Sequence, residues 1–338
     1  MMPKVAIVIL NFNGEKFLRE LLPNVVANSP EGEVVVADNG SSDGSIAFMK
    51  NEMPHVRLIE FTENYGFAEG YNRALRLVEA EYYVLLNSDV EVTEGWLRPL
   101  IAYMDAHPQT AACQPKLMAF HQRDSFEYAG ACGGFIDMLG YPFCRGRIFG
   151  TVEKDENQYD SVMEVFWATG ACLMVRSRLY HEIGGLDGEF FAHMEEIDMC
   201  WRMKARGHSI VCVPQSKVFH VGGGTLSAES PRKTYLNFRN NMLMLYKNQF
   251  NHYGFRFVVR MLLDYVAALQ MLVQRKPKNC QAVFKARCDF WKMKKSFAEK
   301  RNANKQLTTC RLPQGMMPTS ILMAYYLKGK KRFNQLNW

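Results

Sequence analysis

Long apolar runs are absent from this sequence of 338 residues, although 48% of the residues are hydrophobic. No stretch reaches the roughly eighteen uncharged apolar residues that cross a bilayer. The longest candidate, residues 255–273, is interrupted by Arg256, Arg260 and Asp264. The apolar run at residues 5–10 is too short for the core of a signal peptide, and no small-residue cleavage site follows it. We therefore expect neither a membrane-spanning helix nor a signal peptide.

Cysteine pairs and phosphate-binding glycine motifs are also absent. The nine cysteines are scattered without a C-x-x-C motif, and Cys172, Cys200 and Cys212 have apolar neighbours. This pattern indicates reduced thiols in a cytoplasmic protein. The chain has no G-x-x-x-x-G-K-[ST] motif, and no G-x-G-x-x-G motif follows its first predicted strand. These absences argue against a P-loop enzyme and against a dinucleotide-binding enzyme.

Acidic residues are scarce in the last third of the chain. Residues 226–338 contain 22 Lys and Arg but only 4 Asp and Glu, whereas residues 1–225 contain 19 and 30. This asymmetry, which the net charge of +7 hides, predicts a domain over residues 1–225 and a basic helical extension over residues 226–338. The excess positive charge of the extension predicts a phosphate-rich partner, either an anionic membrane or a nucleic acid.

Strands and helices alternate over the first hundred residues. Strands are predicted at residues 5–10, 33–37, 56–61 and 82–86, and helices at 15–24, from about 45, and at 68–79. This alternation favours an α/β fold with a parallel sheet, in which ligands bind beyond the carboxyl ends of the strands. Residues 115–160 show no regular pattern, and helical periodicity returns at residues 195–205 and 234–274.

Acidic residues at the predicted strand ends are candidates for nucleotide and metal binding. Asp38 can accept a hydrogen bond from a base or a ribose hydroxyl, although a turn-forming aspartate is the plainer alternative. Asp89, with Glu91 two residues further on, can bind a hard cation such as Mg²⁺ or Mn²⁺. Such a cation would neutralise a diphosphate. The alternative for Asp89 is a cap of the following turn.

A second acidic group consists of Glu195, Glu196 and Asp198. On a helix, Glu195 and Asp198 share one face. Crowded carboxylates raise one another's pKa, which suits a general base, whereas a solvated first helical turn is the alternative. His220 comes shortly before the glycines at 222–224, and it is a candidate metal ligand or, alternatively, a structural residue.

The order of these segments resembles that of the family 2 glycosyltransferases, and in particular their rhamnosyltransferase-like branch. The resemblance covers residues 4 to about 248 and is carried by residues 5–13, 36–45, 63–72, 85–89, 169–171, 184–187, 195–202 and 220–223. It implies the GT-A fold, with a mixed, mostly parallel sheet flanked by helices and, in this chain, a helical C-terminal extension.

The same resemblance implies a nucleotide-sugar site and a metal site. The nucleotide sugar is expected to contact Leu10, Phe12, Asp38, Asn64, Gly66, Asn72 and Asn87. Asp89 is expected to hold a divalent cation, Mg²⁺ or Mn²⁺, and His220 to complete its coordination. Asn87 replaces the first aspartate of the family's D-x-D motif, so that Asp89 is the one strong carboxylate of that motif.

Glu196 is implied to be the general base, with Asp198 and Glu195 as alternatives, and Thr169 and Gly170 to border the acceptor. Glu196 replaces an aspartate of the family's E-D motif, and it therefore reaches one methylene further. The departures at Asn87 and Glu196 also motivate a second hypothesis, a non-catalytic protein that binds a nucleotide sugar or a glycan. Asp89, Asp198 and His220 argue against that hypothesis.

The implied reaction is inverting transfer from a nucleotide-diphosphate sugar, with dTDP-L-rhamnose as the favoured donor. The implied acceptor is a glycan or a lipid-linked glycan in cell-surface polysaccharide synthesis. The basic extension suits peripheral docking on the inner face of the cytoplasmic membrane, and a helical cap with a solvated basic face is the alternative. No RNA-recognition motif accompanies the charge, so we expect no nucleic-acid partner.

Overall fold

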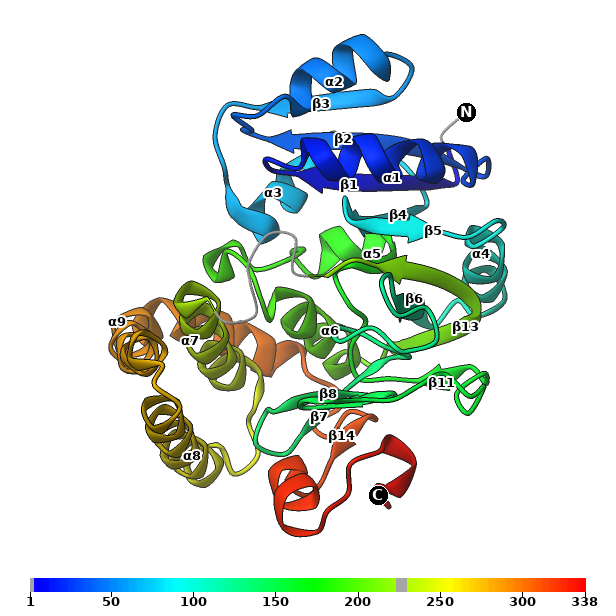
Figure 1. The fold of residues 1–338 in the computed structure, drawn as a ribbon. Helices are drawn as coiled ribbons and strands as arrows, with labels where there is room; N and C mark the ends of the chain where they lie inside the picture. Colours follow the sequence, from blue (N-terminus) through cyan, green and yellow to red (C-terminus); the bar gives the residue numbers. More distant parts are fainter. Residues whose placement is uncertain (1–2, 223–229) are drawn as a thin grey trace.

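The computed structural model describes residues 3–222 and 230–338, and one large sheet runs through the first range (Figure 1). Its strands are β1 (Val5–Asn11), β2 (Gly32–Asn39), β3 (Arg57–Phe61), β4 (Tyr82–Asn87), β5 (Val90–Val92), β6 (Thr110–Ala119), β11 (Met163–Glu164), β12 (Cys172–Arg176) and β13 (Ser209–His220). The spatial order is β11-β13-β6-β12-β4-β1-β2-β3, and β5 pairs with β13. Strands β1 to β4 pair in parallel, whereas β12 is antiparallel to both β4 and β6. The expected mixed α/β sheet is thereby confirmed.

Helices cover both faces of this sheet: α1 (Glu15–Ala27), α2 (Ser45–Glu52), α3 (Gly66–Leu75), α4 (Leu97–Ala106), α5 (Ser177–Glu182) and α6 (Glu195–Ala205). On β1, Val5, Ile7 and Ile9 belong to the core beneath α1, α2 and α4, whereas Ala6 and Val8 belong to the core on the opposite face. Successive side chains of a strand point to opposite faces, so β1 is a strand buried on both sides.

Residues 115–160 are not irregular, contrary to the expectation from the sequence. The long strand β6 ends within this segment, and a second, smaller sheet follows, made of β7 (Gly134–Asp137), β8 (Pro142–Cys144), β9 (Arg147–Ile148), β10 (Thr151–Val152) and β14 (Met316–Met317). These strands are only two to four residues long. A two-residue alternation needs at least four residues to be recognised, so the sequence pattern does not reveal them.

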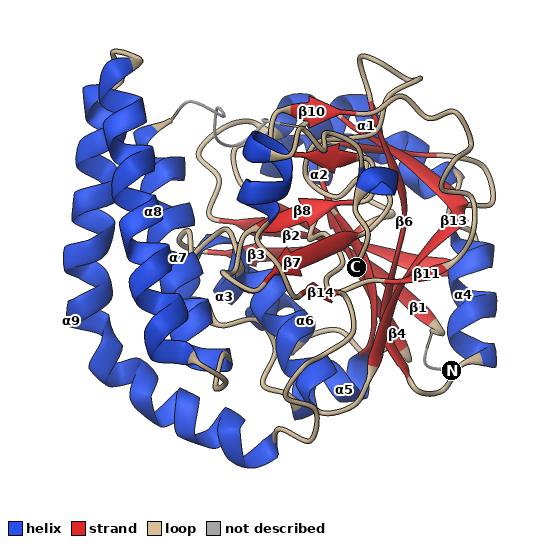
Figure 2. Ribbon diagram, turned by 90° about the horizontal axis from the view of Figure 1, so that it is seen from below, coloured by secondary structure: helices blue, strands red, loops and turns tan. Residues whose placement is uncertain are grey.

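The C-terminal region begins with α7 (Pro231–Asn248), α8 (Tyr253–Val273) and α9 (Pro277–Leu307). The helical periodicity expected at 234–274 therefore comes from two helices, which are separated at His252, whose φ is 50°. Figure 2 shows the three helices side by side along one edge of the molecule. Among the described residues, none of the helices combines the length and the apolar character needed to cross a membrane.

After α9 the chain returns to the small sheet. Strand β14 pairs in parallel with β7, and short helical turns follow at Met323–Leu327 and Phe333–Gln335. The ring of Phe333 packs on that of Phe135 in β7, with 4.8 Å between the ring centroids. Residues 230–338 thus pack against the preceding part of the chain through both helices and a strand. The glycines and threonine at 223–225, expected to end the α/β unit, lie outside the described residues.

Gly134 lies beneath the indole ring of Trp167, where a Cβ atom would overlap the ring. The ring is not free to move, because Nε1 of Trp167 donates a hydrogen bond to the carbonyl oxygen of Phe135 at 2.9 Å. We expect Gly134→Ala to lower the free energy of unfolding by about 1–3 kcal/mol, measured by chemical denaturation. Gly150→Ala is the matched control, since no described atom other than those of its chain neighbours lies within 4 Å of its Cβ position. Equal losses in the two variants would contradict this account.

Candidate active site

Three strand ends meet at one edge of the main sheet. Leu10 of β1 pairs in register with Asn87 of β4, and Asn11 pairs with Asp38 of β2. Three of the residues expected to contact a nucleotide therefore lie side by side at the carboxyl ends of neighbouring parallel strands, where α/β sheets bind ligands. Phe12 follows β1 directly, and 39% of its surface is exposed.

Asp38 is almost completely buried, and both of its carboxylate oxygens are engaged. Oδ2 accepts a hydrogen bond from Nδ2 of Asn11 at 2.9 Å, and Oδ1 accepts one from the backbone N–H of Ser41 at 2.8 Å. The side chain therefore closes the turn after β2, which is the turn-forming role considered for Asp38 as an alternative to nucleotide binding. A carboxylate has about four acceptor positions, so a base or ribose contact is still chemically open to it. That contact stays a prediction.

Asn39, which the sequence patterns did not indicate, ties this turn to the segment before α3. Its Nδ2 lies 3.1 Å from Oδ1 of Asn64 and 3.0 Å from the carbonyl oxygen of Gly66, and its Oδ1 accepts from the N–H of Tyr65. Gly66 has a φ of 78°, and a Cβ atom there would overlap the ring of Phe191. Glycine is therefore required at this position. Asn64 and Gly66 are held close to the end of β2.

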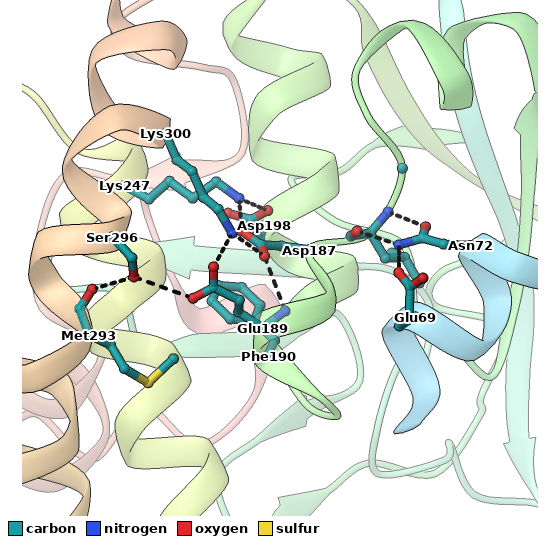
Figure 3. Close-up of polar contacts among 12 residues, drawn as sticks. Glu69, Asn72, Asp187, Glu189, Phe190, Asp198, Lys247, Met293, Ser296 and Lys300 are labelled. Carbon is teal, nitrogen blue, oxygen red and sulfur yellow. Dashed lines mark hydrogen bonds and ion pairs between the residues drawn. The ribbon is translucent and has the colours of Figure 1, made fainter. Parts of the chain in front are cut away.

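The structure corrects the expectation that Asn72 contacts the nucleotide. Its Nδ2 donates to the carbonyl oxygen of Leu186 at 2.8 Å and lies 3.3 Å from Oε2 of Glu69. Its Oδ1 accepts from the hydroxyl of Tyr180 and from the N–H of Leu186, at 2.7 and 3.0 Å. These contacts consume the hydrogen-bonding capacity of a buried amide. Asn72 instead fixes α3 to the loop that precedes α6, through its contacts with Leu186. Figure 3 shows its side chain together with Glu69 of the same helix.

Asp89 and His220, the predicted metal ligands, lie together although they are 131 residues apart. Pairing of β5 with β13 places His220 opposite Val90, so that Nε2 of His220 is 3.1 Å from Oδ1 of Asp89. Its Nδ1 is 3.3 Å from Oε1 of Glu127, a residue that no sequence pattern indicated. Burial opposes a charge on the imidazole, but the hydrogen bonds and charges of Asp89 and Glu127 raise the pKa of His220 to about 10. Burial likewise opposes ionisation of Asp89, yet His220 lowers the pKa of its carboxyl group.

The side chains around His220 have the chemistry of a divalent-cation site. Two carboxylates and one imidazole are ligand types found with Mg²⁺ and Mn²⁺. Within residues 3–222 and 230–338, however, no three His, Cys, Asp or Glu side chains are already arranged around one metal position. Cation binding would therefore require His220 to lose a proton and the ligands to move. Glu91, the other acid considered on this loop, is engaged by Arg123 through two contacts of 2.8 Å.

Glu196 lies in the first turn of α6, next to the segment expected to border the acceptor. A Cβ atom on Gly170 would be 3.9 Å from Cβ of Glu196. The side chain is partly exposed, but its Oε2 is buried without a hydrogen-bond partner among the described residues. Burial raises the pKa of Glu196 to about 7, against the opposing effect of the backbone N–H groups of the first helical turn. A carboxyl group that titrates near neutral pH is suited to take a proton.

The other two acids of this helix have different environments. Glu195 is buried, and the burial together with the charges of Glu196 and Asp198 raises the pKa of Glu195 well above its usual range. Burial therefore favours the protonated, neutral form of Glu195. Thr169, expected to border the acceptor, is buried, and its hydroxyl oxygen accepts a hydrogen bond from the backbone N–H of Ala171.

Asp198 cannot act as the general base, which corrects its place among the alternatives. It is completely buried, and its Oδ2 lies 2.9 Å from both Nε of Arg202 and Nζ of Lys247. Its Oδ1 accepts from Nδ2 of Asn248 at 2.7 Å. Because both of its carboxylate oxygens are engaged and none of its surface is exposed, Asp198 has no free path to a substrate. Among the three acids of α6, this leaves Glu196 as the base that the geometry favours.

The loop before α6 has an unusual backbone. Phe191, His193 and Met194 have φ values of 66°, 70° and 73°, a region that residues other than glycine rarely adopt. Nδ2 of Asn240, on α7, lies within 3 Å of three carbonyl oxygens of this loop, those of Phe190, Ala192 and His193. Such backbone strain persists only where the surroundings impose it, and it is common at functional sites. The one sequence signal for Asn240 was an amide inside a helical pattern.

A buried group of charges joins the same loop to the C-terminal helices (Figure 3). Nζ of Lys247, on α7, lies 2.6 Å from Oδ2 of Asp187 and 2.9 Å from Oδ2 of Asp198. Nζ of Lys300, on α9, lies 2.6 Å from Oδ1 of Asp187 and 3.1 Å from Oε1 of Glu189. Burial opposes ionisation of Asp187, but the two lysines lower its pKa far below the usual range. Helices α7 and α9 are thereby fixed to the segment that carries Glu196.

Lys247→Met would leave two buried aspartates short of a cation, so we expect a loss of about 3–5 kcal/mol in the free energy of unfolding at pH 7. Because the folded-state pKa of Asp187 is lowered, the cluster stabilises the fold above the unfolded pKa, about 3.9. This contribution decreases as the pH falls further. The difference in the free energy of unfolding between wild type and variant should therefore become smaller below about pH 4. Denaturant titrations at several pH values measure it.

Lys292→Met is the matched control for this variant, because the Lys292 side chain is 77% exposed and its pairing with Asp289 is on the surface. We expect it to change the free energy of unfolding by less than about 1 kcal/mol. A Lys247→Met loss no larger than that of Lys292→Met, or a loss that stays constant from pH 7 to about pH 3, would refute the buried-cluster interpretation.

Comparison with known proteins gives a consistent result. A family profile described as "Glycosyl transferase family 2" matches residues 6–162. The N-acetylglucosaminyl-diphospho-decaprenol L-rhamnosyltransferase of Mycobacterium tuberculosis is 29% identical over 224 residues, which cover 61% of this chain and 71% of that protein. Rhamnosyltransferase WbbL of Escherichia coli is 23% identical over 227 residues, which cover 64% of this chain and 83% of WbbL.

Solved structures show the same fold. The crystal structure of GalNAc-T7 with UDP, GalNAc and Mn²⁺ superposes with a TM-score of 0.59 at 16% identity, over 89% of this chain. The superposed part is 55% of the GalNAc-T7 chain, so this chain spans about half of that protein. The strand ends that carry Asp38 and Asp89 lie within the matched family profile. This chain therefore has the GT-A fold and, over residues 6–162, a match to the family 2 glycosyltransferases, and it is similar to the rhamnosyltransferases named above.

Proposed function

We propose that this glycosyltransferase moves L-rhamnose from dTDP-L-rhamnose to a glycan or lipid-linked acceptor in the synthesis of a cell-surface polysaccharide. The observation that carries the proposal is its similarity to two proteins named as rhamnosyltransferases, over 61% and 64% of the chain. The name of the M. tuberculosis relative specifies a diphospho-decaprenol acceptor, which supports a lipid-linked acceptor here. We further propose a cytoplasmic location, in keeping with nine free cysteines.

In this proposal the donor lies along the ends of β1, β2 and β4. The base stacks near Phe12 and Leu10 and meets a free lone pair of Asp38. The diphosphate lies over the loop of Asp89, close to His220. A divalent cation held by Asp89 and His220 would neutralise the negative charge of the diphosphate. The Mn²⁺ in the GalNAc-T7 structure supports that requirement.

The proposed chemistry is a single in-line displacement with inversion at the anomeric carbon. The acceptor hydroxyl lies beside Gly170 and gives its proton to the carboxylate of Glu196. The hydroxyl oxygen forms a bond to C1 of the sugar while the bond from C1 to the diphosphate oxygen breaks. The nucleoside diphosphate leaves with the electron pair of that bond. Burial favours the neutral form of Glu195 by raising its pKa, which keeps a second negative charge away from the base.

Glu196→Gln should reduce the turnover rate at least about a hundredfold, because general-base catalysis contributes factors of this size. Donor binding should be unchanged, since Glu196 lies on the acceptor side. In the wild type, kcat/KM should rise with pH through about 7 and level off above it, because only the ionised carboxylate of Glu196 accepts a proton. Initial rates from pH 5.5 to 9 and calorimetric titration with donor measure both effects.

Glu195→Gln is the matched control for this experiment. Because burial favours the neutral form of the Glu195 carboxyl group and raises its pKa, a neutral amide of the same shape should retain most of the turnover. A large loss in Glu195→Gln together with full activity in Glu196→Gln would assign the base to Glu195 instead.

A donor screen tests the proposed function directly. Purified protein with Mn²⁺ or Mg²⁺ is offered a panel of nucleotide-diphosphate sugars with lipid-linked acceptors, and nucleoside diphosphate release is measured. We expect the highest rate with dTDP-L-rhamnose and loss of activity with EDTA, which Mn²⁺ restores. Faster release from another sugar nucleotide would reject the rhamnose donor. Nucleotide binding without transfer to any acceptor would favour the non-catalytic hypothesis.

A further inference from the structure

Helix α8 has an inverted distribution of polar and apolar side chains. Its buried face contains the ion pair of Arg260 and Asp264, with 2.9 Å between Nε and Oδ1, and Arg287 of α9 contacts the other carboxylate oxygen. Its outer face carries seven apolar side chains that are each at least half exposed, namely Phe255, Val258, Leu262, Val266, Leu269, Leu272 and Val273. A helix on the surface of a globular protein normally has the opposite arrangement.

These exposed side chains form one continuous stripe. Most of them are three or four residues apart, so they line one side of the helix along its 21 residues, which is about 30 Å. Helix α9 widens the stripe, because Phe284 stacks on Tyr265 and Trp291 packs against Phe257. Phe284 and Trp291 are themselves 52% and 50% exposed. An apolar surface of this extent marks an interaction site rather than scattered surface residues.

The helix that packs beside this stripe, α9, is rich in exposed positive charge. Exposed basic side chains of the α8–α9 turn and of α9 are Arg275, Lys278, Lys285, Lys292 and Lys295. Residues 253–307 contain thirteen Lys and Arg and three acidic residues. Of the three, Asp264 is buried, and Asp289 pairs with Lys285 and Lys292. The charge that faces solvent here is therefore mostly positive.

We propose that the outer face of α8, with Phe284 and Trp291 of α9, docks this protein on an anionic membrane surface. We call these residues the docking face. An amphipathic helix that lies in the plane of a membrane has this combination of an apolar stripe and flanking basic residues. Lys and Arg at the edge are attracted by anionic headgroups, and tryptophan is enriched at interfacial depth. The sequence predicted a membrane contact for the basic extension over residues 226–338, and the docking face would supply the apolar part of that contact from α8.

A second copy of the chain fits this face less well. A symmetric dimer brings the same surface patch of both subunits together, so the lysine rows of the two copies would lie close to one another. Like charges in contact oppose such a dimer. An anionic leaflet instead supplies the opposite charge at the edge and an apolar environment for the stripe.

The docking face is firmly connected to the candidate active site. The inner side of α9 carries Lys300, which pairs with Asp187, and Phe297, whose ring stacks on that of Phe190 at 5.9 Å. Figure 2 shows α8 and α9 at the outer edge of the molecule, with the sheets beyond α7. A docked protein would therefore hold α6, which carries Glu196, at a set distance from the membrane. Docking itself requires neither donor nor acceptor, so its test is independent of the transfer reaction.

Vesicle flotation tests the proposal with the full chain and no substrates. One set of vesicles contains phosphatidylcholine alone, and the other also contains phosphatidylglycerol. We expect binding to the anionic vesicles, weaker binding at higher salt, and at least about a tenfold lower partition coefficient for Leu262→Ser/Val266→Ser/Leu269→Ser. Lys278→Gln/Lys295→Gln should reduce binding to anionic vesicles in the same direction, because it removes two charges from the edge.

Leu77→Ser/Leu312→Ser is the matched control, since these leucines are 55% and 65% exposed but lie outside the docking face. All variants should keep the thermal midpoint of the wild type, because the replaced side chains are exposed. Wild-type protein that does not float with anionic vesicles would overturn the proposal, as would equal binding of the α8 triple variant and the wild type. A wild-type dimer that the triple variant converts to a monomer would assign the face to a second copy.

Discussion

The pairing of buried charges at Asp187 and Asp198 is the interaction on which the rest of this structure depends. Both carboxylates are removed from water, and an unpaired buried charge costs several kcal/mol. Lys247 and Lys300 reach them from α7 and α9, and Arg202 reaches Asp198 from the same helix. Helix α6 and its preceding loop can therefore take this conformation only when the C-terminal helices are in place. The C-terminal region is in this sense part of the active site.

This dependence explains how the chain holds the strained loop at residues 191–194 next to Glu196, whose Oε2 has no hydrogen-bond partner among the described residues. Asn240 binds the carbonyl groups of the loop, and the adjacent first turn of α6 presents Glu196 with a raised pKa. On the other side of the site, His220 lowers the pKa of Asp89. When the environment raises the pKa of one carboxyl group and lowers that of another, the first can accept a proton while the second stays a charged ligand. One site can then bind a charged diphosphate and also remove a proton at neutral pH.

The C-terminal helices have two chemically different surfaces. Toward the sheets they present Lys247, Lys300 and the buried ion pair of Arg260, all of which satisfy charges inside the protein. Away from the sheets, α8 presents leucine, valine and phenylalanine side chains. Such an inverted helix is favourable when its polar face contacts polar groups inside the protein and its apolar face contacts a membrane. One region would thereby serve both the geometry of the site and its position relative to a lipid-linked acceptor.

The sequence by itself determined the features that depend on local spacing. The alternating strands and helices of the first hundred residues, the bounds of α6 and the acids at the strand ends were all readable, because their patterns repeat over short distances. Only the tertiary structure decided which acid could be the base, because it pairs Asp198 with Lys247, 49 residues away. It also engages the side chain of Asn72 with Leu186, so that this amide is not available to a nucleotide. It also brought Glu127 to His220 and assembled the small sheet from strands too short to show a pattern. Burial and charge pairing arise between distant segments, and they set the pKa values on which the chemistry depends.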